Sequence, residues 1–169
     1  MQHIATTCLV GACLWLCADA TAGVGVDRTE RSNAPGVCQA ARPDFTSGLR
    51  ARPLALQNEG AGTAFVTCSI DGGDGPGGKM INLVEVELAN ATGSPLQVAC
   101  TLVDGYGRSA TYLSLSATVP GSGNGVATLV FDPSMLPEAP AWFLLPNLSC
   151  ALPPGAAIHQ LVHVYQWES

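Results

Sequence analysis

The chain has 169 residues, of which 47% are hydrophobic and 12% are charged, enough for one domain with a sizeable core. Its formal net charge is −6 and its sequence has no run of Lys or Arg, which excludes the basic face that a nucleic-acid-binding protein needs. The 19 glycines and 12 prolines favour tight turns over long helices, and therefore an all-β fold.

The first residues have the pattern of a secretion signal. Residues 4–17, IATTCLVGACLWLC, are apolar, and the small residues of CADATAG follow them. We therefore predict a signal peptide over residues 1–22 and a secreted or periplasmic protein. MQH contains no Lys or Arg, which leaves the true start codon open. A lipid anchor on Cys13 is disfavoured because Leu-Trp-Leu would follow it, and no apolar run is long enough to span a membrane.

Residues 23–35, GVGVDRTERSNAP, have little apolar periodicity and predict a flexible N-terminal arm. The folded domain is then expected over residues 36–169, where short apolar runs alternate with turn-rich segments. The runs cover 36–41, 53–58, 63–70, 80–89, 95–103, 110–119, 125–131, 142–152 and 157–167. Several alternate apolar and polar residues with period two. This pattern predicts an antiparallel β-sandwich, jelly-roll or immunoglobulin-like, of about eight or nine strands.

The chain has seven cysteines, and three of them lie in the predicted signal peptide. The other four are Cys38, Cys68, Cys100 and Cys150. Their wide spacing excludes a C-x-x-C zinc or redox motif, so we expect two disulfides. Four cysteines allow three pairings and the sequence does not decide among them; we adopt Cys38–Cys68 and Cys100–Cys150 as a guess.

The order of the cysteine segments resembles that of a known family. A Cys near the mature start is followed by LALQNEGAGTAFVTCSI, LQVACTL, LSCALPPGAAI and the terminal HVYQWE. This order is similar to that in a family of small exported bacterial proteins of unknown function, and the similarity covers most of residues 36–169. Ser69 stands where that family often has Pro. The resemblance implies a disulfide-stapled β-sandwich and supplies no activity.

Residues 73–79, GDGPGGK, match the first seven positions of the phosphate-binding loop pattern G-x-x-x-x-G-K-[ST]. Met80 replaces the hydroxyl residue, and a strand rather than a helix is expected next, so nucleotide binding is disfavoured. Asp71 and Asp74 could instead ligate calcium through their carboxyl oxygens. A calcium-stabilised module is therefore one alternative, although neither EF-hand spacing nor a tandem glycine-rich repeat is present.

Other polar groups give no recognised catalytic motif. His159 and His163 form H-x-x-x-H, but on a strand they would lie about 13 Å apart and could not share a metal ion. Candidate hydrolytic groups are Ser114 or Ser116 with Asp104 or Asp132, and the pair Glu85 and Glu87. No G-x-S-x-G elbow accompanies them, so a secreted hydrolase with an unrecognised site is kept as an alternative.

Two aromatic residues lie outside the clearest runs. Tyr106, in the turn DGYGRS, could stack on a sugar or anchor a protein partner. Trp142, beside Phe143 and two leucines, is expected in the core. The sequence thus predicts an exported, non-enzymatic binding or envelope-associated module without a cofactor, and an envelope glycan or protein as its partner.

Overall fold

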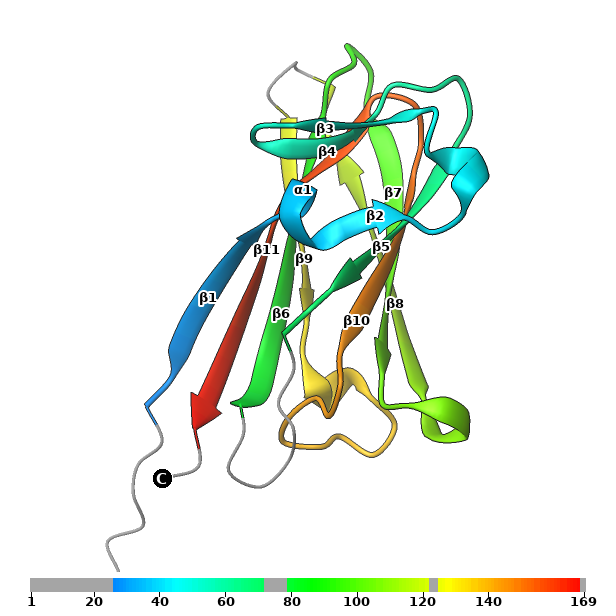
Figure 1. The fold of residues 1–169 in the computed structure, drawn as a ribbon. Coiled ribbons are helices and arrows are strands. Elements are labelled where there is room, and N and C mark those ends of the chain that lie inside the picture. Colours follow the sequence, from blue (N-terminus) through cyan, green and yellow to red (C-terminus); the bar gives the residue numbers. More distant parts are fainter. Residues whose placement is uncertain (1–25, 72–78, 122–124, 168–169) are drawn as a thin grey trace, which may run out of the picture.

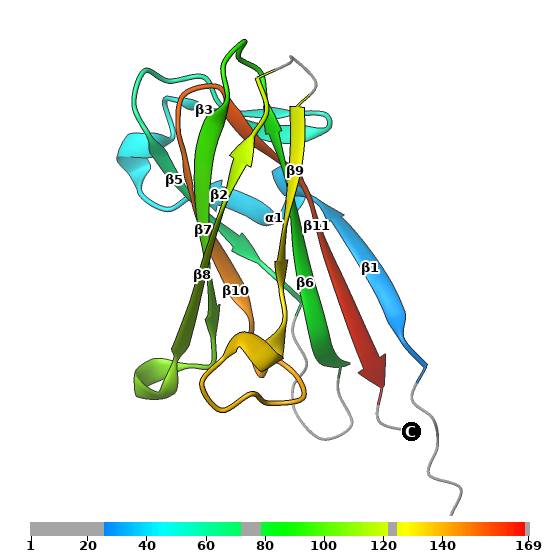
Figure 2. The same ribbon diagram turned by 180° about the vertical axis from the view of Figure 1, so that it is seen from behind.

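The computed structural model describes residues 26–71, 79–121 and 125–167. They form two antiparallel β-sheets packed face to face (Figures 1 and 2). The elements are β1 (Arg28–Asn33), α1 (Ala34–Val37), β2 (Cys38–Ala40), η1 (Pro43–Phe45), β3 (Leu49–Arg52), β4 (Ala55–Asn58), β5 (Ala64–Ser69), β6 (Lys79–Asn90), β7 (Leu96–Asp104), η2 (Gly107–Ser109), β8 (Thr111–Val119), β9 (Gly125–Phe131), η3 (Pro133–Met135), β10 (Asn147–Leu152) and β11 (Ala156–Trp167). The described part of the chain contains no helix with the length and apolar character of a membrane span. The predicted signal peptide lies outside the described residues.

The strand order is that of a jelly roll. One sheet has the order β3-β4-β11-β6-β9, with β1 also paired to β11, and the other has the order β2-β5-β10-β7-β8. From β4 to β11 the chain changes sheet at every connection except the β7–β8 hairpin. This alternation is typical of a jelly roll. The β-sandwich prediction is confirmed, and each of the nine predicted runs contains a strand.

The structure adds two strands that the sequence analysis does not predict, β1 and β3. Residues 28–33 pair along their whole length with residues 160–165 of β11, so this part of the predicted flexible arm belongs to the sheet. The segment RTERSN is polar and has no apolar alternation, which is why the pattern fails there. Its pairing covers an edge of β11 that β4 contacts only at Ala157 and Ile158. An uncovered edge would leave backbone groups open to another chain.

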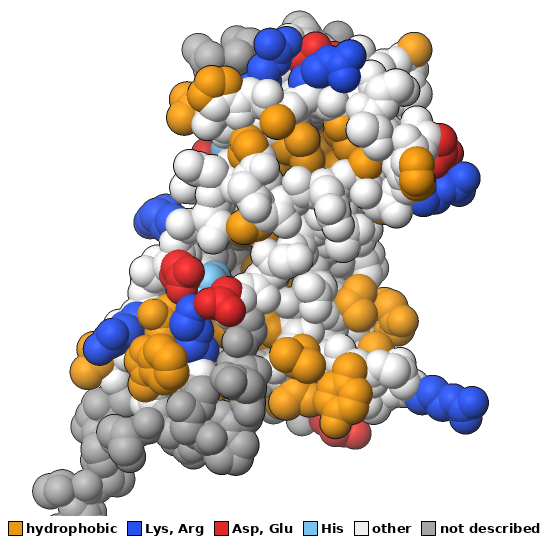
Figure 3. Space-filling view, viewed as in Figure 1, with side chains coloured by type: hydrophobic (Ala, Val, Ile, Leu, Met, Phe, Trp, Pro, Cys, Tyr) orange, Lys and Arg blue, Asp and Glu red, His pale blue; other side chains and the backbone are white. Residues whose placement is uncertain are grey.

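The core lies between the two sheets, and β7 shows how the alternation builds it. Val98, Cys100 and Leu102 are buried, whereas Gln97 and Ala99 point outward and are exposed. Successive strand side chains point to opposite faces, so each strand gives one set to the core and one to the surface. On the face seen in Figure 3, charged side chains gather towards the ends and both side margins, and the middle is mainly uncharged.

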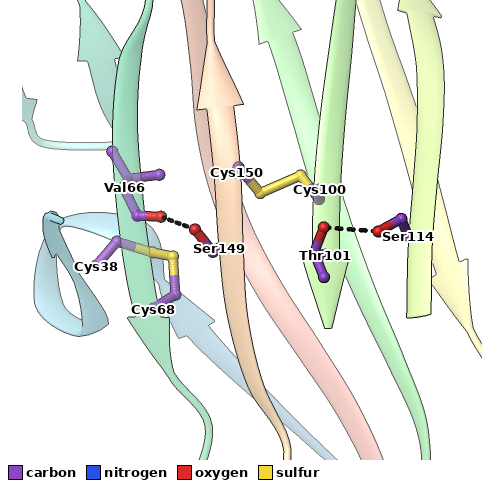
Figure 4. Close-up of a disulfide and its surroundings, with 8 residues drawn as sticks. All are labelled: Cys38, Val66, Cys68, Cys100, Thr101, Ser114, Ser149 and Cys150. Carbon is purple, nitrogen blue, oxygen red and sulfur yellow. Dashed lines mark hydrogen bonds between the residues drawn. A yellow bond between two sulfur atoms is a disulfide. The ribbon is translucent and has the colours of Figure 1, made fainter. Parts of the chain in front are cut away.

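Both disulfides lie within the five-stranded sheet. Cys38 bonds to Cys68 and joins β2 to β5, and Cys100 bonds to Cys150 and joins β7 to β10 (Figure 4). In each pair the two cysteines are directly opposite in neighbouring strands. This is the pairing that we guessed from the sequence. The six-stranded sheet is held by hydrogen bonds and packing.

A buried asparagine organises the turn that leads from β4 to β5. The side-chain amide of Asn58 donates hydrogen bonds to the carbonyl oxygens of Gly62, at 2.8 Å, and Leu152, at 2.7 Å. Its oxygen accepts a hydrogen bond from the Gly60 N–H, at 2.9 Å. Leu152 belongs to the opposite sheet, so Asn58 links the two sheets at the upper end of the sandwich.

Asn90, at the end of β6, repeats this arrangement in the next crossing between the sheets. Its amide donates to the carbonyl oxygens of Ser94, at 2.8 Å, and Val119, at 3.1 Å. Its oxygen accepts from the Thr92 N–H, at 2.7 Å. Val119 lies in the five-stranded sheet, so Asn90 is a second polar link between the sheets. All polar atoms of this buried side chain have partners.

Candidate functional site

The lower end of the sandwich carries a pocket of about 230 Å³ between the β7–β8 turn and the β9–β10 loop. Its wall combines three kinds of side chain. The carboxyl groups are those of Asp104 and Glu138, the hydroxyl groups those of Ser109 and Thr111, and the apolar side chains include Leu136 and Leu144. A concave site with a few convergent polar groups on an apolar wall is the usual form of a small-molecule site.

Asp104 forms the inner part of this pocket. It is the last residue of β7 and is opposite Thr111, the first residue of β8. Only 7% of Asp104 is exposed, and its Oδ1 accepts a hydrogen bond from the Leu145 N–H at 2.8 Å. This bond fixes the carboxyl group and also fastens the β9–β10 loop to β7.

The β7–β8 turn presents Tyr106 at the lower end of the sandwich. Gly105 has φ 94° and lies so close to the Ser109 carbonyl that a Cβ would come within 3.1 Å of that oxygen. The backbone N–H of Ser109 and its side-chain hydroxyl both donate to the Tyr106 carbonyl, at 3.2 and 2.9 Å. Tyr106 is 67% exposed, so a turn with its own hydrogen bonds holds an exposed ring, as the sequence predicts.

The β9–β10 loop is anchored by Phe143, which is buried and whose N–H donates to the Ile81 carbonyl at 2.7 Å. The residues on either side point outward, and Trp142 is 46% exposed and Leu144 45% exposed. The prediction that Trp142 belongs to the core is therefore wrong. Three consecutive apolar residues give no alternation in the sequence, so nothing in it indicates that only Phe143 packs inside.

Ala139 lies between two lining residues of the pocket, Glu138 and Pro140. Its φ of 41° is positive, which is uncommon for a residue other than Gly. The turn that holds it closes with a hydrogen bond from the Ala139 N–H to the Leu136 carbonyl at 2.9 Å. Backbone in such regions persists where the surrounding structure fixes it, often at ligand sites.

A second cluster of polar and aromatic groups lies at the same end, around Lys79. Lys79 Nζ contacts Glu30 Oε2 at 2.8 Å and Asp71 Oδ2 at 2.7 Å. It also lies 5.0 Å from the ring centre of Tyr165. His163 Nε2 is 3.4 Å from Glu30 Oε2 but makes no hydrogen bond among the described residues. This cluster joins β1, β6, β11 and the end of β5.

The cluster perturbs its own titrating groups. Burial lowers the pKa of His163 below its ordinary value of 6.5, with Glu30 and Asp71 acting against this shift and Lys79 adding to it. Hydrogen bonds to Asp71 and Glu30 raise the pKa of Lys79, and the bond from Lys79 lowers the pKa of Asp71. Lys79 thus stays protonated between two carboxyl groups.

Acidification below about pH 6.5 should destabilise the protein through His163. In the unfolded chain this imidazole takes up a proton near its ordinary pKa of 6.5, whereas the buried imidazole does so only at lower pH. Between these values the unfolded state binds more protons, so the free energy of unfolding falls as the pH decreases. We expect His163→Gln to lack this part of the pH dependence in urea unfolding between about pH 7.5 and about pH 5. If the free energy of unfolding depended on pH in the same way in the wild type and in His163→Gln, the pH dependence could not be assigned to His163.

The structure keeps the predicted hydrolytic groups apart. Ser114 and Ser116 point outward from β8, with Ser114 Oγ bonded to Thr101 Oγ1 at 2.8 Å. Glu85 and Glu87 lie on the outward face of the other sheet, where Glu87 contacts His159 at 3.2 Å. Asp132 caps η3 by accepting from the Ser134 N–H at 2.8 Å. His159 and His163 are also separate, because His159 contacts Glu87 whereas His163 is buried beside Glu30.

A further hollow, of about 300 Å³, lies on the outward face of the six-stranded sheet. Its wall is built largely from alanines, and among its lining residues only Gln57, Asn90 and His159 carry polar side chains. Asn90 already uses both its oxygen and its amide in the turn after β6. The hollow therefore has three polar side chains in its wall, against four in the pocket around Asp104.

The loop that resembles a phosphate-binding loop is followed by a strand. β6 begins at Lys79, so no helix N-terminus follows the glycines, and the Lys79 ammonium contacts carboxyl groups of this chain. Among the described residues, no group of three or more His, Cys, Asp or Glu could hold a metal ion. Asp74 lies outside the described residues, and calcium binding by Asp71 and Asp74 stays a prediction.

No family model matches the chain, and no curated protein matches it. Among solved structures, it is similar to the C-terminal CBM6 of the laminarinase LamC from Zobellia galactanivorans, with 13% identity, a TM-score of 0.48, and 80% of this chain and 98% of that one covered. It is also similar to an exo-β-1,3-galactanase from Phanerochaete chrysosporium, with 13% identity and a TM-score of 0.46. This second alignment covers 80% of the chain but only 29% of the galactanase. At these identities, function has to be argued from the residues of this chain.

Proposed function

We propose that this chain is a non-enzymatic binding protein that holds a neutral carbohydrate in the pocket around Asp104. The observation that carries the proposal is the combination at one end of the sandwich: a pocket lined by two carboxyl and two hydroxyl side chains, with the exposed rings of Tyr106 and Trp142 on its two loops. Carboxyl and hydroxyl oxygens match the hydroxyl groups of a sugar, and aromatic faces cover its C–H surface. The proposal rests on these residues and not on the fold similarities.

The size and rigidity of the pocket agree with a small sugar unit. About 230 Å³ is below the usual range for drug-sized ligands, which starts at about 300 Å³, so one or two sugar rings are expected inside. The Leu145–Asp104 and Phe143–Ile81 hydrogen bonds hold the longer loop in place. A preformed site loses little conformational entropy when a ligand binds. The two disulfides, with the apolar segment at residues 4–17, favour action outside the cytoplasm.

Trp142→Ala and Tyr106→Ala should each weaken oligosaccharide binding by about tenfold, because an anchoring ring contributes more than 1 kcal/mol. We expect at least one member of a panel of neutral gluco-, manno- and galacto-oligosaccharides to bind in isothermal titration calorimetry. Trp167→Ala is the matched control, because Trp167 is also part-exposed but lies in the Lys79 cluster. Equal affinity of all three variants and the wild type would contradict the location of the site.

A hydrolase is the second candidate, because Asp104 and Glu138 line the same pocket and two carboxyl groups suffice for glycoside hydrolysis. Against it, Asp104 is buried and one of its oxygens already binds the Leu145 N–H. Incubation of the protein with the oligosaccharide that it binds should release no new reducing ends. Release that Glu138→Gln abolishes would establish the hydrolase instead.

A further inference from the structure

No strand residue on the outward face of the five-stranded sheet is charged, and Arg42 lies only at the margin of that face, beside the Phe45 ring that packs on Phe65. We call this surface the uncharged face, and its residues, all in the described part of the chain, are Gln39, Phe65, Thr67, Ser69, Gln97, Ala99, Thr101, Val103, Tyr112, Ser114, Ser116, Thr118, Asn147, Ser149 and Ala151. The chain as a whole has 20 charged residues, 7 basic and 13 acidic. The outward face of the other sheet carries Arg31, Glu85 and Glu87, so the absence of charge is specific to one sheet.

Many side chains of the uncharged face are short, and several of them are held in place by hydrogen bonds. Thr101 Oγ1 and Ser114 Oγ are 2.8 Å apart (Figure 4), and Thr118 Oγ1 donates to Gln97 Oε1 at 2.7 Å. Ser149 Oγ donates to a backbone carbonyl of β5 at 3.2 Å. Side chains that already have fixed partners lose little entropy when a surface covers them, and they keep one hydrogen bond when water leaves.

The uncharged face is also regular and open. Side chains on one face of a sheet repeat about every 6.6 Å along a strand and about every 4.8 Å between strands. The extensive contacts of β10, β7 and β8 with other described elements are with their neighbours in the sheet and, for β8, with β9 and β6. The result is an open, twisted array of hydroxyl, amide and methyl groups, with exposed rings at Phe65 and Tyr112.

We propose that the uncharged face is a second binding surface, which binds along an ordered neutral polysaccharide. Such a polymer presents rows of hydroxyl groups and no charge, so it matches the uncharged face in both respects. A charged partner would bury ions without counter-charges, which is costly. A second copy of this chain fits less well, because stable subunit interfaces have apolar cores, and the centre of this face consists of Ser, Thr and Ala side chains. The inference rests on the proposed function only for the class of partner.

The test measures depletion of the protein from solution by three insoluble neutral polymers, cellulose, chitin and β-1,3-glucan. We expect at least one of them to retain the wild type, with little effect of added NaCl because no charges meet at the surface. Ser116→Glu, Ser116→Lys and Ala99→Lys should each lower the partition constant by about tenfold, because each buries an unpaired charge. Opposite signs at position 116 should act alike, which attraction between charges would not produce.

Thr128→Glu and Thr128→Lys are the matched controls. Thr128 is an exposed hydroxyl residue on β9, an edge strand like β8, but it belongs to the other sheet, and its variants should bind the polymers as the wild type does. Trp142→Ala should keep polymer binding while weakening oligosaccharide binding, so that a failure of one site is distinguished from a failure of the other. The inference would be overturned if the polymers retained all variants of the uncharged face as well as they retain the wild type. It would also be overturned if none of the three polymers retained the wild type. A dimer in light scattering that Ser116→Glu dissociates would also overturn it, because the face would then bind a second copy.

Discussion

Replacing Cys100 and Cys150 together by alanine should lower the free energy of unfolding by about 4 kcal/mol. The bond spans a sequence separation of 50 residues, and removing it gives the unfolded chain back the conformational freedom of a long loop. Both cysteines are buried and directly opposite in β7 and β10, so the hydrogen-bond ladder can keep its register in the variant. Urea unfolding, analysed by linear extrapolation, measures the loss.

The second disulfide provides the control for this experiment. The Cys38–Cys68 bond spans 30 residues, and the entropy of loop closure depends on the logarithm of loop length. Removing it should therefore cost only about 0.5 kcal/mol less than removing Cys100–Cys150. Reduction of the wild type should cost more than either double variant. An unfolding midpoint that neither replacement moves would show that the disulfides do not stabilise the fold.

Asn90→Ala should lower the free energy of unfolding by about 3 to 4 kcal/mol, because three buried or part-buried backbone groups lose their partner. These groups are the carbonyls of Ser94 and Val119 and the N–H of Thr92. The substitution also removes a link between the sheets, since Val119 belongs to the five-stranded sheet. Denaturant unfolding with unchanged m-value would show that the loss is one of stability.

Two further variants separate the causes of this effect. Asn90→Asp keeps the acceptor for Thr92 but places a carboxyl group against two carbonyl oxygens, and we expect a similar loss. Asn33→Ala is the matched control, because Asn33 is exposed and makes no side-chain capping bond at α1. It should change stability by less than about 0.5 kcal/mol. Equal stability of Asn90→Ala and Asn33→Ala would contradict the role of Asn90.

The sequence predicts the sandwich well because its core strands alternate. In β7, residues Val98, Cys100 and Leu102 alternate with Gln97, Ala99 and Thr101, and the structure buries the first set. Period two, together with four cysteines outside the predicted signal peptide, leads to the prediction of a disulfide-stapled β fold. β1 is not predicted in this way. Its pairing depends on backbone groups and on the Glu30–Lys79 contact, and these interactions produce no apolar pattern in the sequence.

The candidate site is harder to predict, because its parts come from separate loops. Asp104 looks like any polar residue at a strand end, and Glu138 like any loop residue, until the fold brings them to one pocket. Tyr106 was predictable because glycines flank it, whereas Trp142 was assigned to the core from its apolar neighbours. The absence of charge on the five-stranded sheet becomes visible only when the register shows which residues share that face.

The pairing of β1 shows that the folded unit includes residues 28–33. A fragment that begins at residue 36, the domain start suggested by the apolar pattern, would lack the strand that pairs with residues 160–165. The outer edge of β11 would then present free N–H and C=O groups over most of its length. In two such fragments these edges could pair with each other, or take up the β1 segment of an intact molecule. Because RTERSN pairs with these backbone groups, we expect it to protect the protein from strand exchange.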